Sequence, residues 1–210
     1  MSKPDLSGAY ALSTPDDCLK LYADWADSYD ADFAEGMGYL LPAQVAAAFL
    51  EVGGEGPVLD VGAGTGLLAV ALRGLGFKGA IDGVDLSPEM LERARAKGCY
   101  RDLVAADITR PLTLPANYHG IVSSGTFTHG HVGPEGLPPL LAIAAPGAHF
   151  ALSVNAGVWE AKGFPAALDA LAGQIRDLTL TEAPIYDARA AARAPDHAGD
   201  RAMILRFRRA

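Results

Sequence analysis

The fold is decided by residues 57–66, which read PVLDVGAGTG. Val58, Leu59 and Val61 form a short apolar run, which is typical of a buried parallel strand. Glycines follow at positions 62, 64 and 66, and an apolar stretch with helical spacing begins at Leu67. A strand, a glycine-rich turn and a helix in direct succession predict the ligand-binding end of a doubly wound α/β sheet.

Strand and helix patterns alternate after this turn. We expect helices at 67–75, 88–97, 137–144 and 164–174, and further strands at 79–85, 100–105, 120–124 and 148–155. This alternation predicts a mostly parallel sheet with helices on both faces. The last two apolar runs, 177–185 and 202–208, are joined by a polar connection without a clear crossover helix. An antiparallel hairpin at the sheet edge is therefore expected.

Two helical patterns precede the glycine turn. The first begins after Thr14, a good N-cap followed by proline, and carries apolar and aromatic residues at steps of three and four. The second is expected from about Tyr39 to Val52. We expect residues 1–210 to form one domain, with an N-terminal arm and lid helices over 1–52 and a Rossmann-like core over 53–210.

Composition limits the partners. Half of the 210 residues are hydrophobic, and the formal net charge is −8. Nucleic acids and anionic membranes need a basic surface, so neither partner is expected. The two cysteines lie far apart, no run of 18 apolar residues occurs, and the N-terminus lacks a signal-peptide pattern. These features predict a cytoplasmic protein, monomeric or homodimeric, without a metal site.

Three acidic residues point to the ligand. Asp60 lies two residues before a Gly-x-Gly-x-Gly spacing, where it would repel the pyrophosphate of a dinucleotide. S-adenosylmethionine has no phosphate, and its amino group and sulfonium are cationic. Asp85 follows the first glycine by 23 residues, the distance at which an acid accepts from ribose hydroxyls of either cofactor. Asp107, with Ile108 beside it, follows the next strand and is placed to meet adenine.

The motifs together resemble those of class I S-adenosylmethionine-dependent methyltransferases. The matching segments are VLDVGAGTG at 58–66, GVDLSPEML at 83–91 and Ala106-Asp107. The resemblance is to the small-molecule branch that includes the ubiquinone/menaquinone methyltransferases and the methyltransferase-like protein of the Williams–Beuren region. It runs from Leu21 to about Asn155, and it is specific as a set although each motif alone is not.

The resemblance implies a fold and a set of cofactor-binding residues. The family's sheet has the order 3-2-1-4-5-7-6 with strand 7 antiparallel, in agreement with the hairpin expected here. In the family the glycine turn holds the methionine part, and other side chains hold the ribose, the adenine and the carboxylate. The implied cofactor-binding residues are Tyr22, Tyr29, Asp60, Gly62, Ala63, Gly64, Asp85, Leu86, Met90, Asp107, Ile108 and Ser124. For Tyr22 and Tyr29, the alternative is an aromatic stripe buried in the core.

No catalytic residue is evident from the sequence. His129 and His131 lie in the loop after the fourth strand, at the edge where ligands bind in open α/β sheets. Each is a candidate general base or substrate contact, and the alternative is a solvated loop histidine. Their His-x-His spacing has no matching ligands elsewhere, so a metal is not expected.

The sequence predicts a methyltransferase whose acceptor is a small, partly apolar molecule. Transfer from a sulfonium is an in-line displacement, so the enzyme needs mainly alignment and a dry pocket. The acceptor pocket is expected from the N-terminal helices, the 125–139 loop and residues 157–164, which include Trp159. A non-catalytic S-adenosylmethionine-binding protein is the first alternative. A nicotinamide-dependent oxidoreductase is the second, against which Asp60 and the glycine spacing argue.

Overall fold

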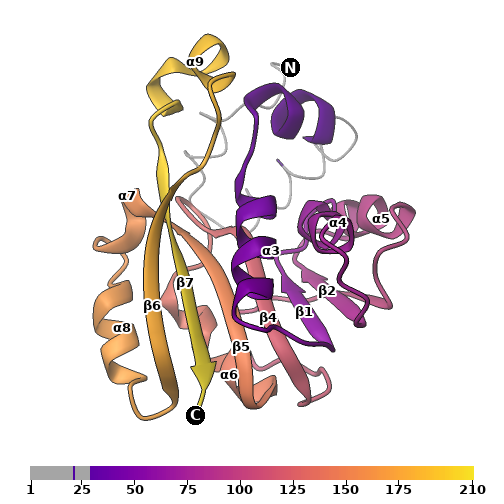
Figure 1. Ribbon diagram of the computed structural model, residues 1–210, viewed down its shortest axis with the longest axis vertical. Helices are drawn as coiled ribbons and strands as arrows, with labels where there is room; N and C mark the ends of the chain where they lie inside the picture. The colour runs from indigo at the N-terminus through magenta and orange to yellow at the C-terminus, as the bar shows by residue number, and fades with distance from the viewer. Residues whose placement is uncertain (1–20, 22–28) are drawn as a thin grey trace.

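The computed structural model describes Leu21 and residues 29–210, and its centre is a seven-stranded sheet (Figure 1). The strands are β1 (Val58–Val61), β2 (Ile81–Asp85), β3 (Asp102–Ala105), β4 (Tyr118–Phe127), β5 (Ala144–Asn155), β6 (Ile175–Pro184) and β7 (Arg201–Arg209). The α-helices are α3 (Leu41–Glu51), α4 (Leu67–Gly74), α5 (Pro88–Ala96), α6 (Leu137–Ile143), α7 (Ala156–Trp159), α8 (Phe164–Ala170) and α9 (Ala190–Arg193). A π-helix, η1, spans Tyr29–Glu35, and short 3-10 turns lie at Pro134–Gly136 and Pro195–His197.

The sheet order is β3-β2-β1-β4-β5-β7-β6, which confirms the predicted topology. The strands from β3 to β5 pair in parallel, whereas β7 pairs antiparallel with both β5 and β6. The β6–β7 pairing is the predicted edge hairpin. The connection between these strands is longer than a turn and contains α9 and a 3-10 turn, where the sequence indicated no clear helix.

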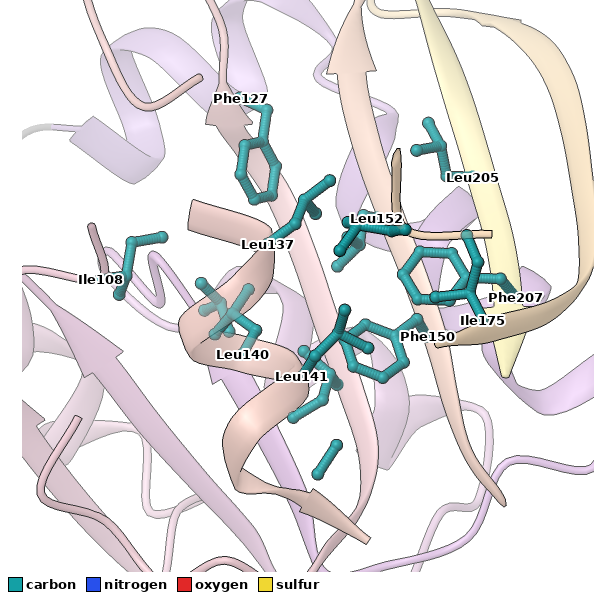
Figure 2. Close-up of a cluster of buried hydrophobic side chains, with 14 of the residues drawn as sticks. Ile108, Phe127, Leu137, Leu140, Leu141, Phe150, Leu152, Ile175, Leu205 and Phe207 are labelled. Carbon is teal, nitrogen blue, oxygen red and sulfur yellow. The ribbon is translucent and has the colours of Figure 1, made fainter. Parts of the chain in front are cut away.

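The sheet is covered on both faces, as buried parallel strands require. On one face α3 and α4 pack Phe49 and Leu72 against Val58 and Val122. On the other face lies the larger cluster shown in Figure 2, to which α6 and α8 contribute (Leu137, Leu140, Leu141 and Leu168). The alternation of side chains along each strand sends neighbours to opposite clusters, so that β1 serves both.

Helix α3 has two roles. Its buried residues Leu41, Val45 and Phe49 make it a layer of the core, although the sequence placed it among the lid helices. Its first turn, with Leu41 and Pro42, also lines the main cavity. The assignment of residues 1–210 to one domain remains a prediction.

Strand β4 is longer than the sequence indicated and carries residues 125–127, which were expected in a loop. Its pairing with β5 is irregular between Ser123 and Phe127, a local bulge that a simple apolar pattern does not reveal. In the described part of the chain, no helix combines the length and the apolar character needed to cross a membrane.

Phe150 of β5 provides a test of this core. Its side chain is fully buried and stacks on Phe207, with ring centroids 4.4 Å apart. We expect Phe150→Ala to lower the free energy of unfolding by about 3–5 kcal/mol, because it leaves a cavity between β5 and β7. Leu180→Ala is the control on β6, where the side chain is 43% exposed and the expected loss is below about 1 kcal/mol. Equal losses in urea denaturation of the two variants would contradict this packing.

Candidate functional site

The glycine turn between β1 and α4 is built on left-handed backbone. Gly62, Gly64 and Gly66 have φ values of 65°, 53° and 92°, which side chains rarely tolerate. A Cβ at Gly62 would lie 1.9 Å from Oγ1 of Thr126, so a side chain there would need a shift in β4. The backbone N–H groups of Gly62 and Ala63 both donate to the carbonyl of Val84, which fixes the turn against β2.

A cavity of about 360 Å³ opens beside this turn. It lies at the carboxyl ends of the parallel strands, where ligands bind in open α/β folds. It brings together the glycine turn, the carboxyl ends of the central strands and the segments that follow them, the start of α3, and the residues just after β6. Of the predicted cofactor-binding residues, the cavity is lined by Tyr29, Gly62, Ala63, Gly64, Asp85, Leu86, Met90, Asp107, Ile108 and Ser124.

Asp85 ends β2 at the wall of the cavity. Its two carboxylate oxygens accept from the backbone N–H groups of Gly64, at 2.8 Å, and Ser87, at 2.9 Å. Burial raises the pKa of Asp85, and the bonds from Ser87, Gly64 and Leu86 oppose that rise. The carboxylate is thus fixed to the turn, with lone pairs left for a ligand hydroxyl.

Asp107 and Ile108 form the next part of the wall. Oδ1 of Asp107 accepts from the hydroxyl and the N–H of Thr109, and these bonds help hold the pKa of Asp107 below its usual value. Ile108 is buried and belongs to the main hydrophobic cluster. An ionised carboxylate beside an apolar surface suits a flat ring that has a donor on its edge.

Asp60 lies beneath the turn and does not line the cavity. Its side chain is 1% exposed, and its Oδ2 accepts from the Tyr100 hydroxyl at 2.7 Å. Oδ1 has no hydrogen-bond partner among the described residues. Burial raises the pKa of Asp60 to about 7, against the opposing effect of Tyr100, and the nearby Asp85 adds to the rise. Whether Asp60 neighbours a bound cation stays a prediction.

The aromatic residues of the N-terminal motif are only partly described. Tyr29 is half-buried and lines the cavity, and it also packs against the core cluster on the α3 face. A contact of Tyr29 with the cofactor stays a prediction. Tyr22 lies outside the described residues. At the end of β4, Ser124 lines the cavity, whereas Ser123 is buried and donates to the carbonyl of Val61.

The two loop histidines occupy different places. His131 lines the cavity, and His129 does not. Burial is the main cause that lowers the pKa of both imidazoles, which favours their neutral form. Nζ of Lys162 donates to the carbonyls of Thr128 and His131 and so holds the loop in place. His131 therefore lies at the cavity with its neutral form favoured, and its role as a base or substrate contact stays a prediction.

One side of the cavity comes from segments that sequence reasoning did not connect. Tyr39 and Tyr186 meet there, with ring centroids 6.0 Å apart, and Leu41 and Ile185 lie beside them. Tyr39 and Tyr186 form an antiparallel bridge between the start of α3 and the connection after β6. The apolar end of a predicted strand gave no signal that Ile185 and Tyr186 would reach a site formed mainly by residues far earlier in the chain.

The expectation that Trp159 lines the acceptor pocket is wrong. Its ring stacks on Phe164, with centroids 5.7 Å apart, and packs against the main hydrophobic cluster. The last residues of β5 contribute Ser153 and Asn155 to the cavity instead. Within the described ranges, no three His, Cys, Asp or Glu side chains gather in an arrangement that would hold a metal.

The raised pKa of Asp60 predicts a pH-dependent stability in the absence of ligand. The folded protein holds this proton up to about pH 7, whereas an exposed aspartate loses it near pH 4. The stabilising contribution is therefore complete below about pH 4 and is lost as the pH rises to about 7. Asp60→Asn keeps a carbonyl for Tyr100 but cannot ionise. We expect the free energy of unfolding, measured by urea denaturation, to fall less between pH 5 and pH 8 in the variant than in the unaltered protein, by on the order of 1–4 kcal/mol. An equal fall in both proteins would contradict the assignment.

Comparisons with known proteins agree with this geometry. Residues 58–145 match the family model described as a methyltransferase domain. Human methyltransferase-like protein 27 is 36% identical over 129 residues, which cover 58% of this chain and 51% of that protein. The chain thus spans about half the length of this curated relative.

Solved structures share the fold at low sequence identity. Phosphoethanolamine N-methyltransferase 2 of Haemonchus contortus, in complex with phosphomonomethylethanolamine and S-adenosylhomocysteine, aligns with a TM-score of 0.67 and 14% identity over 92% of this chain and 58% of that chain. Magnesium protoporphyrin IX methyltransferase of Synechocystis, with bound S-adenosylmethionine, aligns with a TM-score of 0.55 and 19% identity over 80% of this chain and 78% of that chain. Residues 58–145 thus match a methyltransferase domain, and the sheet order of the whole chain agrees with the fold that these methyltransferase structures share.

Proposed function

We propose that this protein binds S-adenosylmethionine in the cavity beside the glycine turn and transfers its methyl group to a small-molecule acceptor. The observation that carries the proposal is the meeting of three elements at one wall: the left-handed turn 62–66, the fixed carboxylate of Asp85, and the pair Asp107 and Ile108. Each suits a different part of one elongated nucleoside ligand.

The turn and the carboxylates contact different parts of the ligand. The absence of side chains at Gly62 and Gly64 lets the backbone approach the methionine part closely. Asp85 accepts from the ribose hydroxyls, as acids at the end of this strand do in Rossmann-like sites. Leu86, Met90 and Ile108 pack around the adenine, and Asp107 accepts from its exocyclic amine. Tyr29, Ser124 and the proposed partner Tyr22 belong to the methionine end.

Charge at the cavity favours a cation over a pyrophosphate. Asp85, Asp107 and Glu135 line it, and Asp60 lies beneath, while its described lining includes no lysine or arginine. A dinucleotide phosphate would meet carboxylates, and the described lining offers no lysine or arginine to bind it. The ammonium and sulfonium of S-adenosylmethionine are stabilised by the same field. This argument separates the proposal from the oxidoreductase alternative.

In this proposal, the residues of the site act mainly by aligning the acceptor with the methyl group of the cofactor. When bound, S-adenosylmethionine supplies a methyl group on a cationic sulfur, which is already activated for displacement. The enzyme's residues must place the acceptor in line with that bond and exclude water. The apolar side of the cavity, with Leu41, Ile185, Tyr39 and Tyr186, supports both tasks. Neutral His131 is the candidate base for an acceptor that enters protonated.

The size and the lining of the cavity support a small acceptor. The cavity volume of about 360 Å³ is shared with the cofactor, and the tyrosine pair provides ring surfaces for an apolar portion of the acceptor. Of the relatives, one is in complex with phosphomonomethylethanolamine and another is a magnesium protoporphyrin IX methyltransferase. The net charge of −8 supports a function without nucleic acid. A cytoplasmic location and a monomeric or homodimeric state remain predictions.

Calorimetric titration tests the cofactor assignment. We expect S-adenosylmethionine and S-adenosylhomocysteine to bind and NAD not to bind. Asp85→Ala should lower the affinity for S-adenosylhomocysteine by at least about tenfold, because buried charge-assisted hydrogen bonds to the ribose are lost. Asp169→Ala, an exposed aspartate on α8 away from the cavity, is the control and should keep full affinity. Binding of NAD alone would refute the proposal.

Turnover separates an enzyme from a binding protein. We expect S-adenosylhomocysteine to form when the protein is incubated with S-adenosylmethionine and fractionated small metabolites. His131→Gln should lower kcat for the active fraction while S-adenosylhomocysteine binds as before, because His131 lies at the cavity but holds no predicted part of the cofactor. Transfer of a labelled methyl group from S-adenosylmethionine to macromolecules alone would contradict the proposed small-molecule acceptor. Binding without turnover in any fraction would favour the non-catalytic alternative.

A further inference from the structure

A three-way contact joins the N-terminal segment to the glycine turn. Oγ1 of Thr65 donates to Oδ1 of Asp30 at 2.5 Å, and Nζ of Lys97 lies 2.5 Å from Oδ2 of Asp30. The same Nζ also donates to the backbone carbonyl of Thr65. Asp30, Thr65 and Lys97 come from η1, the glycine turn and the end of α5, and we call them the clasp.

The clasp differs from the ion pairs on the surface of the protein. The Thr65 residue is 2% exposed, and the side chains of Lys97 and Asp30 are 22% and 38% exposed. By contrast, Arg95 and Glu92 on α5 are 58% and 74% exposed and 3.8 Å apart. Short, charge-assisted hydrogen bonds with reduced solvent access stabilise a structure more than exposed pairs do. The geometry of the clasp therefore suits it to hold η1 against the glycine turn.

Both ends of the clasp continue into the wall of the cavity. Tyr29, which precedes Asp30, lines it, and so does Thr65 itself. Gly64, which precedes Thr65, donates its N–H to Asp85. The clasp links η1 directly to the glycine turn through Asp30 and Thr65, so we expect a change in it to move Tyr29 relative to the turn.

We propose that Asp30 is a positioning residue, which holds Tyr29 and η1 over the methionine half of the cofactor site through Thr65 and Lys97. The inference rests on the proposed function, in which the glycine turn takes the methionine part of the ligand. Its consequence is selective: ligands with a methionine part depend on the clasp, and ligands that end at the nucleoside do not.

Two ligands distinguish this role from general stabilisation. S-adenosylhomocysteine carries the amino-acid part, and 5′-methylthioadenosine lacks it but keeps the ribose and adenine. We expect Asp30→Asn and Lys97→Met each to lower the affinity for S-adenosylhomocysteine by about tenfold, which is the effect of losing one charged hydrogen bond. Affinity for 5′-methylthioadenosine should change less than about threefold. The double variant should lose no more than either single variant, because both remove one shared contact.

Matched controls lie close by. Arg95→Met removes a cation two residues from Lys97 whose ion pair is exposed, and it should leave both affinities unchanged. Thr65→Ser keeps the hydroxyl and should bind S-adenosylhomocysteine nearly as the natural protein does, whereas Thr65→Val should resemble Asp30→Asn. Should Asp30→Asn fail to fold, Lys97→Met and Thr65→Val carry the same comparison.

The outcomes are distinct. Full S-adenosylhomocysteine affinity in Asp30→Asn and Lys97→Met would overturn the inference and leave the proposed function standing. Equal weakening of both ligands would also overturn it, because it would show a merely structural contact. Failure of the unaltered protein to bind S-adenosylhomocysteine would overturn the proposed function, and with it this inference. Selective loss of the methionine-bearing ligand is the supporting result.

Discussion

The turn between β1 and α4 leaves no space for a side chain at Gly62. Its backbone is left-handed, and Oγ1 of Thr126 in β4 occupies the place that a Cβ would take. This close approach brings the end of β4 against the turn, and the N–H groups of Gly62 and Ala63 fix the turn to β2. Three strand ends therefore meet at one point. The cavity opens at this junction, at the carboxyl ends of the parallel strands.

Burial sets the electrostatics around that point. Asp60 and Asp85 lie close enough for each other's charge to matter, and both have raised pKa values because of burial. Tyr100 and the N–H of Gly64 compensate in part. Burial thus favours the protonated form of Asp60, and the acidic groups that face the partly apolar cavity are Asp85, Asp107 and Glu135. The same three-strand junction thus supplies both the shape and the charge preference of the site.

The opposite side of the cavity depends on contacts across the whole chain. Arg189, ion-paired with Asp187, donates to the carbonyl of Glu35 and so holds the connection after β6 against the N-terminal segment. Figure 1 shows η1 and α9 together at that end of the molecule. The bridge between Tyr39 and Tyr186 completes this wall. This wall is therefore built from segments near the two ends of the described chain, whereas the glycine turn belongs to its middle.

From local signals, the sequence by itself predicted a mostly parallel sheet, an antiparallel edge hairpin and a glycine turn with left-handed backbone. Its resemblance to a known family implied the sheet order and twelve cofactor-binding residues, of which ten line the cavity. Only the tertiary structure decided that Asp60 turns inward to Tyr100, that Trp159 packs against the core, and that Ile185 and Tyr186 reach the site. The reason is physical. A side chain's direction at a strand end, and the meeting of residues some 150 positions apart, depend on packing between elements that no local pattern encodes.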